Sequence, residues 1–508
     1  MEKKNRTVLY ALTLALSVLS TLAFTGFRFA FIFVDNEVFN GFVYLLWGLF
    51  ILNTIHLFWG LRAALAKGEH YKKPVFIINA ILAFLSLVTS IAFLIIGGKA
   101  EFLNYIHMSA ELLPYLGGFY LLLFLLLVFP LMGKFSKSVF VALGGFGLLT
   151  TLLVFLFPPG GFAFKAEPAV FITEDSYAIV FATNRKSVGF VSYEFEGQEY
   201  TLHDTTKGRK DSSTVHSIKV PFEHLDNNSY RIGARRVWED TAYGGHLGKT
   251  IEKAVGMFTP CPSEDFTALC VTDNHGFKAD WVKLQGKGDT VFFLGDVANA
   301  IYRYESFVDN LIIPAGLISL GQKPSVYVRG NHDHRGPAVR AMLEELDFGS
   351  YNFRFEIGDY NFIVLDTGED KDDDNFEYAG FNDYLGFFAE QDEWLLSLEP
   401  KTGYNIALAH CPTLFHEHKG QKWQTAEILE DLGVNIVIGG DFHQTEYVDK
   451  ENSSTGIAYY ICGCQKGMKD LWYTTINFKK GVLDIASFML SDGSEVNRAK
   501  HELNRVTE

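Results

Sequence analysis

Five short polar blocks, each following an apolar run, constrain the fold of this chain most. The apolar runs end at residues 271, 294, 328, 408 and 438, and the polar blocks occupy 273–275, 295–299, 330–333, 410 and 440–443. Alternating strands and helices predict a layered α/β architecture, in which the carboxyl ends of neighbouring strands meet at one edge of a sheet. We therefore expect the polar blocks to converge on one site.

The side chains in these blocks suit cations. They are carboxylates, an amide and imidazoles, from residues such as Asp273, Asp296, Asn331 and His410. Hard oxygen ligands together with imidazoles favour two divalent cations that share one carboxylate. The blocks therefore predict a metal-dependent phosphoesterase.

The first third of the chain predicts a membrane domain. A spanning helix needs about 20 mostly apolar residues, and five such runs occur at about 8–27, 40–61, 75–98, 112–132 and 138–157. We expect residues 1–160 to form an all-α domain of five transmembrane helices. A cleavable signal peptide is a poor alternative, because four more apolar runs follow the first.

Charges in the loops predict the orientation of these spans. Basic residues precede the first span and lie between the second and third and between the fourth and fifth, whereas the other two loops are mainly acidic. Because basic loops favour the cytoplasm, we expect a cytoplasmic N-terminus and, after five spans, an extracytoplasmic catalytic domain in the plasma membrane.

Charge also separates the two parts of the chain. Residues 1–160 carry 11 Lys or Arg against 6 Asp or Glu, whereas the remainder carries 33 against 53. Nucleic acid is not an expected partner of so acidic a region, because polyanions need a basic surface. All five cysteines lie in this remainder. An oxidising compartment permits disulfides, and the odd count leaves at least one thiol unpaired. We expect Cys462 and Cys464 to be buried free thiols rather than ligands of a soft metal.

Beyond the spans, the pattern predicts three further parts. Short β-rich runs separated by polar turns predict a small all-β sandwich at 165–260, similar to fibronectin type III domains. An α/β (or α+β) domain follows at 264–492, with two hairpins at 353–365 and 471–488, and 493–508 is a polar C-terminal tail. The acidic and aromatic segment 368–384 predicts a rim loop over the site.

The blocks resemble the calcineurin-like metallophosphoesterase superfamily, whose motifs are D-x-H, G-D-x-x-D/N, G-N-H-D/E, a lone His and G-H-x-H. All five occur in order over residues 273–443, with the last one altered. The β-rich segment and the run EQDEWL at 390–395 are similar to the purple acid phosphatase branch. The resemblance covers about 170–490 and implies a four-layer β-sandwich flanked by helices.

This resemblance implies a dinuclear metal centre bridged by Asp296. The ligands that it implies are Asp273, His275 and His443 for the first metal and Asn331, His410 and Asp441 for the second. It also implies His332 as the general acid, oriented by Asp333. Asn331 and Arg329 are candidates to contact the substrate, although Arg329 fits a solvent-facing strand position equally well. We expect His334 at the surface.

Two positions depart from the family pattern. Asp441 stands where the last motif has a histidine, and its harder oxygen favours Mn or Mg over Zn. Asn299 stands where purple acid phosphatases carry a metal-bound tyrosine, which weakens the case for Fe. We expect two divalent ions among Mn, Mg, Zn and Fe, with Mn favoured.

The predicted activity is hydrolysis of phosphomonoesters or phosphodiesters by direct attack of hydroxide held by the two metals. The partner is then a phosphoester small molecule, a phosphoprotein or a lipid phosphate, beside the bilayer itself. Two alternatives remain open. One is a non-catalytic, metal-dependent receptor for phosphorylated ligands, and the other is a phosphatase for lipid-linked (pyro)phosphates at the bilayer.

Overall fold

The computed structural model describes residues 162–507 with short gaps, and isolated positions in the N-terminal third. The gaps are 242–243, 370, 376–377, 379, 414–416, 419–420, 423 and 465–469. Apart from the isolated positions, the five predicted spans lie outside the described residues. Among the residues that the structure describes, no helix is both long and apolar enough to cross a bilayer.

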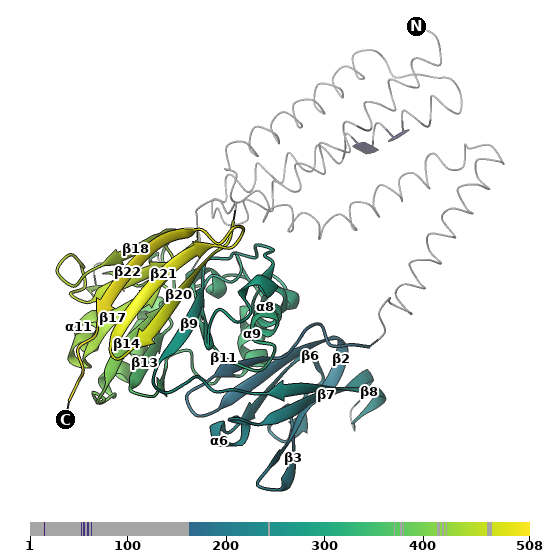
Figure 1. Ribbon diagram of the computed structural model, residues 1–508. Helices are drawn as coiled ribbons and strands as arrows, with labels where there is room; N and C mark the ends of the chain where they lie inside the picture. The colour runs from purple at the N-terminus through teal and green to yellow at the C-terminus, as the bar shows by residue number, and fades with distance from the viewer. Residues whose placement is uncertain are drawn as a thin grey trace. The chain divides into compact units, whose positions relative to one another are not determined.

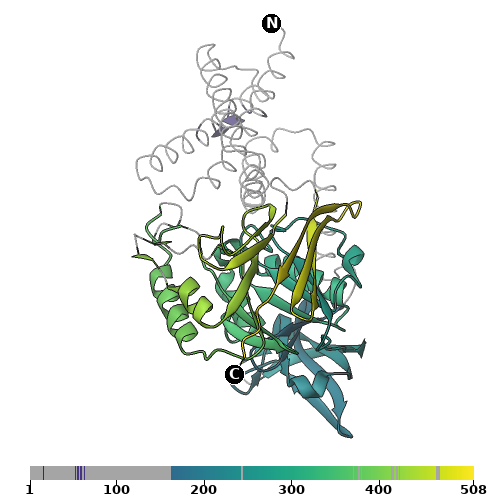
Figure 2. The same cartoon turned by 60° about the vertical axis from the view of Figure 1, so that its left-hand side comes forward.

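The chain forms two compact units. One comprises Gly160–Asp373 and Asp383–Glu508, and the other comprises Met1–Pro159 and Asp374–Asn382. The first unit contains every predicted site residue, and its strands and helices are shown in two views in Figures 1 and 2.

The first sheet contains β9, β10 and β11, which run parallel to one another and to the strand that follows β11 in the sheet. These strands, β9, β10 and β11, are short apolar runs that are buried along almost their whole length, as expected for parallel strands covered on both faces. An antiparallel meander extends the sheet on the side of β9. In sheet order, this part contains β22 (Glu495–Glu502), β21 (Val482–Met489), β20 (Trp472–Lys479), β9 (Phe266–Val271), β10 (Thr290–Leu294) and β11 (Pro324–Val328).

The second sheet has six strands, four of them parallel. The hairpin partner β12 and the antiparallel edge strand β18 close its two sides. In sheet order, the strands are β12 (Phe353–Ile357), β13 (Tyr360–Leu365), β14 (Tyr404–Ala409), β17 (Val434–Gly439), β19 (Ala458–Cys462) and β18 (Thr445–Val448). The two predicted hairpins are confirmed, since β12 pairs with β13 and β20 pairs with β21.

Alternating side chains on the strands create three apolar layers. In β10, Phe292 and Leu294 pack between the sheets, whereas Val291 and Phe293 pack against helices on the outer face. The helical turns and helices on that face are η2 (Trp281–Leu284), α7 (Tyr304–Phe307), η3 (Val308–Ile312), α8 (Ile313–Ser319) and α9 (Val339–Leu346).

Helices α10 (Tyr384–Leu396) and α11 (Thr425–Asp431) cover the outer face of the second sheet, where Leu395 and Leu429 join its apolar layer. Figure 1 shows α8 and α9 on one side of the two sheets and α11 on the other. The predicted four-layer α/β architecture is confirmed.

The strands of the β-rich segment belong to the same sheet as β9–β11. Strand β1 pairs in parallel with β11 and antiparallel with β2, so the hydrogen-bonded sheet continues from β9–β11 into this segment without a break. A register shift between Ala182 and Ser187 bends β2, whose first half pairs with β6 and whose second half pairs with β3 and β7. These strands are β1 (Ala169–Ile172), β2 (Tyr177–Phe195), β3 (Gln198–His203), β6 (Ser213–Val220), β7 (Ser229–Thr241) and β8 (Gly244–Met257).

The segment predicted as a separate sandwich is therefore continuous with the catalytic sheet, and a domain boundary near residue 260 stays a prediction. Two smaller strands, β4 (Thr205–Thr206) and β5 (Arg209–Lys210), pair with each other, and helix α6 (Phe222–Leu225) follows β6. Two further short strands, β15 (Glu417–His418) and β16 (Gln421–Lys422), form a hairpin between β14 and α11.

The segment expected as a polar tail contains strand β22. This strand pairs antiparallel with β21 and forms the edge of the first sheet. Beyond it, Leu503 is buried, and a bridge between Val506 and Gly403 ties the chain end to the second sheet. The segment looks polar in sequence because alternate residues of an edge strand face solvent.

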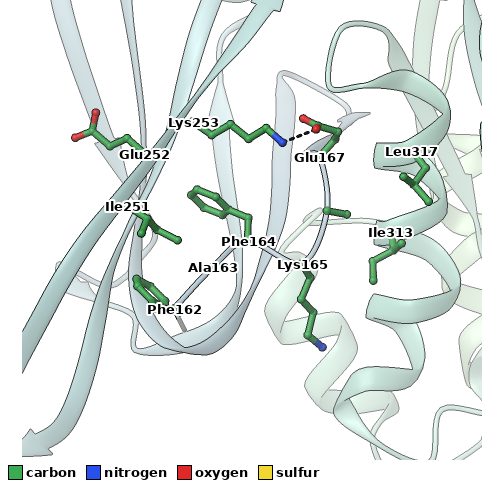
Figure 3. A pocket seen from close by; sticks show the side chains of 11 residues that line it. Phe162, Ala163, Phe164, Lys165, Glu167, Ile251, Glu252, Lys253, Ile313 and Leu317 are labelled. Carbon is green, nitrogen blue, oxygen red and sulfur yellow. Dashed lines mark hydrogen bonds and ion pairs between the residues drawn. The ribbon is translucent and has the colours of Figure 1, made fainter. Parts of the chain in front are cut away.

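A cavity of about 550 Å³ lies away from the strand ends, between the segment 162–167, β8 and α8. Figure 3 shows its apolar walls, including Phe164 and Ile313, and the ion pair between Lys253 and Glu167. None of the predicted site residues lines this cavity.

Candidate metal centre

The predicted ligands lie together just beyond the carboxyl ends of the parallel strands. Asp273 and His275 follow β9, Asp296 follows β10, and Asn331 opens the 3-10 turn η4 (Asn331–His334) after β11. From the second sheet, His410 follows β14, and Asp441 and His443 follow β17. Ligand atoms of these blocks come within 4.8 Å of one another in three overlapping groups, which are Asp273–His275–His443, His275–Asp296–His332 and Asp273–Asp296–His410.

The backbone at the site is unusual. Five predicted ligands have a left-handed backbone, namely Asp273 (φ 52°), His275 (φ 42°), Asp296 (φ 53°), Asp441 (φ 73°) and His443 (φ 52°). This conformation is uncommon for residues with a side chain, and it clusters at functional sites where the surrounding structure holds it in place. Strands β9, β10 and β17 thus end in sharp turns that carry these polar side chains.

Two glycines allow the strand ends to approach one another closely. A Cβ atom at Gly330 would lie 2.2 Å from Asp296 Oδ1 and 2.3 Å from the Asp296 backbone nitrogen. At Gly295, which has φ 94°, a Cβ atom would lie 2.5 Å from His410 Nδ1. Larger residues at either position would separate the blocks.

Asp296 is the centre of the cluster. Its Oδ2 lies 3.5 Å from His275 Nε2, and its Oδ1 lies 3.3 Å from His410 Nε2. The backbone N–H of His332 donates to Oδ1 at 2.9 Å and fixes the carboxylate. The two oxygens of one carboxylate thus face two different imidazoles, as a carboxylate that bridges two cations requires.

The first group brings two imidazoles face to face. The Nε2 atoms of His275 and His443 are 3.2 Å apart, and their rings stack at 12°. Two nitrogens that share one cation at about 2.1 Å have a similar separation. Asp273 completes the group, and its Oδ1 accepts from the backbone N–H of Asp441 at 3.2 Å.

His410 has the orientation of a metal ligand. Its Nδ1 donates to the carbonyl of Leu294 at 2.7 Å, which directs Nε2 into the centre. That Nε2 is buried and lies 3.8 Å from Asp441 Oδ1. The Nδ1 atoms of His275 and His443 are also buried, with no hydrogen-bond partner among the described residues. The donor set and the buried Nε2 of His410, which has no hydrogen-bond partner within the described part of the chain, fit divalent cations.

Burial and the neighbouring charges shift the pKa values of the cluster residues in different directions. Burial raises the pKa of Asp273 to about 7, and the carboxylates of Asp296 and Asp441 add to this effect. Burial also opposes ionisation of Asp296, but His410 and His332 hold its pKa well below the usual range. Burial lowers the pKa of His275 to about 3, so this imidazole is neutral, the form that binds metals.

His332 lies beside the cluster with its ring held from both sides. Its Nδ1 donates to the backbone carbonyl of Asn299 at 2.8 Å. Its Nε2 accepts from Arg335 Nη1, also at 2.8 Å, and its ring is perpendicular to that of His275. Nε2 is therefore the atom that can exchange a proton with a bound molecule.

Asp333 does not orient His332 as predicted. Its carboxylate accepts from the backbone N–H groups of Gly330, at 3.1 Å, and Ala298, at 3.4 Å. It is fully buried, and burial raises its pKa to about 7. Because a carboxylate within the 3-10 turn binds the backbone of its own loop, the carbonyl of Asn299 takes over the orientation of His332. A catalytic role for Asp333 stays a prediction.

Arg329 and His334 are parts of a buried network next to the site. Arg329 Nη1 donates to Asp366 at 2.8 Å, and Nη2 lies 2.9 Å from His334 Nδ1. His334, which we expected at the surface, is buried and binds Asp366 at 2.6 Å. The assignment of Arg329 to substrate binding stays a prediction, as does that of Asn331, which is buried in η4.

Three contributors have no signal in the sequence motifs. They are the Asn299 carbonyl, Arg335 and Glu369, whose carboxylate binds Arg335 through two hydrogen bonds of 2.6 Å. The Asn299 side chain donates to the carbonyl of His275 at 3.2 Å. For Arg335 alone the sequence offers a hint, because it lies three residues after His332 and residues at this spacing face the same side of a 3-10 turn.

The family comparison agrees with this geometry. Residues 266–445 match the family model described as calcineurin-like phosphoesterase, and this span contains every predicted site residue. Over these residues the chain is similar to calcineurin-like phosphoesterases, a family that suggests phosphoric ester hydrolysis at a centre of divalent metals. No curated protein matches the chain.

Three solved structures resemble the chain at low sequence identity. GAP50, the anchor in the inner membrane complex of Plasmodium, is 14% identical, covers 48% of this chain and 90% of its own, and has a TM-score of 0.32. A predicted phosphoesterase from Streptococcus pneumoniae is 13% identical, with 47% and 98% covered and a TM-score of 0.22. The cold-active protein-tyrosine phosphatase of a Shewanella species is 10% identical, with 66% and 98% covered and a TM-score of 0.27.

Proposed function

We propose that the protein is a membrane-anchored, extracytoplasmic metallophosphoesterase that hydrolyses phosphomonoesters or phosphodiesters. The position of Asp296 carries this proposal. Its two carboxylate oxygens face His275 and His410 at 3.5 Å and 3.3 Å, in a cluster that also contains His332. A shared carboxylate of this kind suits two cations about 3.5–4 Å apart, the arrangement of two-metal phosphoesterases.

The residues that would hold the two cations divide around Asp296. Asp273, His275 and His443 lie on one side, and His410, Asp441 and Asn331 are the candidates for the other. Cations held by these residues would supply an acidified water as the nucleophile near neutral pH and would offset the charge of the phosphoryl oxygens. The Asp441 oxygen favours Mn as the metal.

His332 supplies the proton for the departing oxygen. Because a carbonyl can only accept, its hydrogen bond to Asn299 places one proton on Nδ1. Nε2, which accepts from Arg335, has to take up a second proton from solvent before it can donate that proton to the departing oxygen. Arg335 and the metal ligands surround this nitrogen. The proton donor and the centre are thus close enough to serve the two sides of one phosphoester bond.

Within the family, we place the chain beside the purple acid phosphatases but without their coloured centre. Asn299 replaces the tyrosine of that branch, and its amide binds the His275 carbonyl. A neutral amide used in this way supplies no phenolate for Fe(III). We therefore expect a colourless protein when it is loaded with metal.

The membrane location depends on the sequence of residues 1–160. Five apolar runs of spanning length and the alternation of basic and acidic loops support an anchored protein with its catalytic domain outside the cytoplasm.

Turnover by the purified full-length chain tests the activity. The protein is stripped of metal with a chelator, resupplied with Mn, and assayed with a chromogenic phosphomonoester and a phosphodiester. We expect metal-dependent release that Asp296→Ala and Asn331→Ala nearly abolish. Wild-type protein without turnover, or full turnover by Asp296→Ala, would refute the proposal. Tight phosphate binding without turnover would favour the receptor instead.

A further inference from the structure

Arg335 is a cationic side chain at the edge of the metal centre that no family motif assigns. Its Nη1 donates to His332 Nε2 at 2.8 Å, and His332 belongs to the group of residues with ligand atoms within 4.8 Å of one another that includes Asp296 and His275. The side chain is one-quarter exposed, so one part of it faces solvent while the other faces the centre.

The position of Arg335 is fixed from two directions. Its Nε and Nη2 donate to the two carboxylate oxygens of Glu369, each at 2.6 Å, and Glu369 is only 2% exposed. Its backbone carbonyl accepts from Ile301 at 2.6 Å, and its N–H donates to His332 at 3.2 Å. A planar guanidinium that is held through Nε and Nη2 keeps its Nη1 in a constant direction. This reduces the entropy lost when Nη1 binds an anion.

The other arginine near the centre has a different environment. Arg329 is 6% exposed and directs its guanidinium to Asp366 and His334. An incoming phosphoryl group meets Arg335 without breaking a buried ion pair, because the bidentate bond to Glu369 uses Nε and Nη2 and leaves Nη1 toward the centre.

On the basis of the proposed function, we propose that Arg335 binds a phosphoryl oxygen of the substrate and that Glu369 is its positioning residue. Binding exchanges one acceptor of Arg335 Nη1 for another, from His332 Nε2 to the phosphoryl oxygen. The exchange frees the lone pair of His332 Nε2, which then takes up a proton from solvent and can donate it to the departing oxygen. The same side chain therefore couples the arrival of the phosphoryl group to the availability of the proton donor.

The affinity for inorganic phosphate, measured by calorimetry on the Mn-loaded full-length chain, is the direct test. We expect Arg335→Ala to raise both the Kd for phosphate and the KM about tenfold or more, with a smaller fall in kcat, because a hydrogen bond from a charged donor is lost. Arg335→Lys should bind phosphate more tightly than Arg335→Ala, since lysine keeps the positive charge but lacks the fixed N–H donors of the guanidinium.

Glu369→Gln keeps the shape of the side chain that holds Arg335 and removes its negative charge. The Kd for phosphate should therefore rise severalfold, while the metal content stays constant. The matched control is Arg340→Ala on α9, which removes an exposed arginine paired with Glu344 and should change neither constant.

Two results would overturn the inference. One is that Arg335→Ala lowers kcat but leaves the Kd for phosphate and the KM unchanged. That result would mean that Arg335 only positions His332 and does not bind the phosphoryl group. The other, which applies even if Arg335→Ala does not fold, is wild-type phosphate affinity in both Arg335→Lys and Glu369→Gln. Wild-type protein that neither binds phosphate nor hydrolyses phosphoesters would instead refute the proposed function.

Discussion

Arg329 and Arg335 flank the same 3-10 turn, yet their surroundings give them different tasks. Arg329 lies in a buried network in which Asp366 and His334 share its charge. Burial would raise the pKa of Asp366, but Arg329 and His334 lower it to about 2. The ionised carboxylate is therefore stabilised by folding, and the network acts as structural support below the metal centre.

Replacing Arg329 with methionine should lower the free energy of unfolding by about 3–5 kcal/mol at pH 7, because Asp366 loses its main buried partner. The folded pKa of Asp366 lies below its unfolded value of about 3.9, so the stabilisation is present above pH 4 and disappears as the pH falls toward 2. Denaturant titrations of both proteins should thus differ most above pH 4 and converge in acid.

Arg340→Met is the control for this experiment, because Arg340 is exposed and paired only along its own helix. Its melting temperature should match the wild type at every pH. If Arg329→Met is as stable as the wild type and instead has a raised KM, Arg329 contacts substrate as the sequence first indicated.

At the scale of residues, the sequence predicted the candidate ligands better than their supports. Asp273, Asp296 and His410 could be predicted because each follows an apolar strand and carries a side chain that binds metal. The orientation of His332 could not, since the partner is a backbone carbonyl, and every residue has one. Asp333 was predicted from the sequence to orient His332, but its carboxylate binds the backbone of its own loop instead.

The ends of β10 and β11 meet at Gly330, where a methyl group has no room. A Cβ atom there would lie 2.3 Å from the Asp296 backbone nitrogen, so the two strand ends must separate to admit it. We expect Gly330→Ala to lower the free energy of unfolding by about 1–3 kcal/mol. We also expect weaker binding of Mn, measured by calorimetric titration of the metal-free chain, since Asp296 and Asn331 move apart.

Gly386→Ala in α10 is the matched control. A Cβ atom there is 3.4 Å from its nearest neighbour, the side chain of Asp383, and alanine favours a helix by roughly 0.5–1 kcal/mol. This variant should bind Mn normally and be at least as stable as the wild type. Normal Mn affinity in Gly330→Ala would show that the close approach of the strands does not set the geometry of the centre.

At the scale of elements, apolar runs predicted the central strands, but the extent of the sheet could not be read from the sequence. Strand β1 pairs with β11, more than 150 residues further along the chain, and nothing local in β1 specifies that partner. Strand β22 alternates exposed and partly buried residues, so its polar composition resembles that of a free tail. Long-range pairing decides both cases.

The whole chain combines an apolar, basic third with an acidic remainder that contains the candidate metal centre. The net charge is positive over residues 1–160 and strongly negative beyond them. A bilayer spanned five times places the two ends of residues 1–160 on opposite sides, and the basic loops favour the cytoplasm for the N-terminus. Substrates of the candidate centre would then be phosphoesters outside the cytoplasm.

Selective proteolysis can decide this topology. A recognition sequence for a site-specific protease, inserted between Gly160 and Gly161, lies between the predicted last span and the first described strand. On intact cells that express the full chain, an impermeant protease should release a soluble fragment containing residues 161–508, while the N-terminal fragment stays with the membranes after an alkaline wash. A cytoplasmic protein with the same recognition sequence should remain uncut in these cells. Cleavage only after lysis would place the catalytic domain in the cytoplasm, and a full chain extracted by the wash would remove the anchor from the proposal.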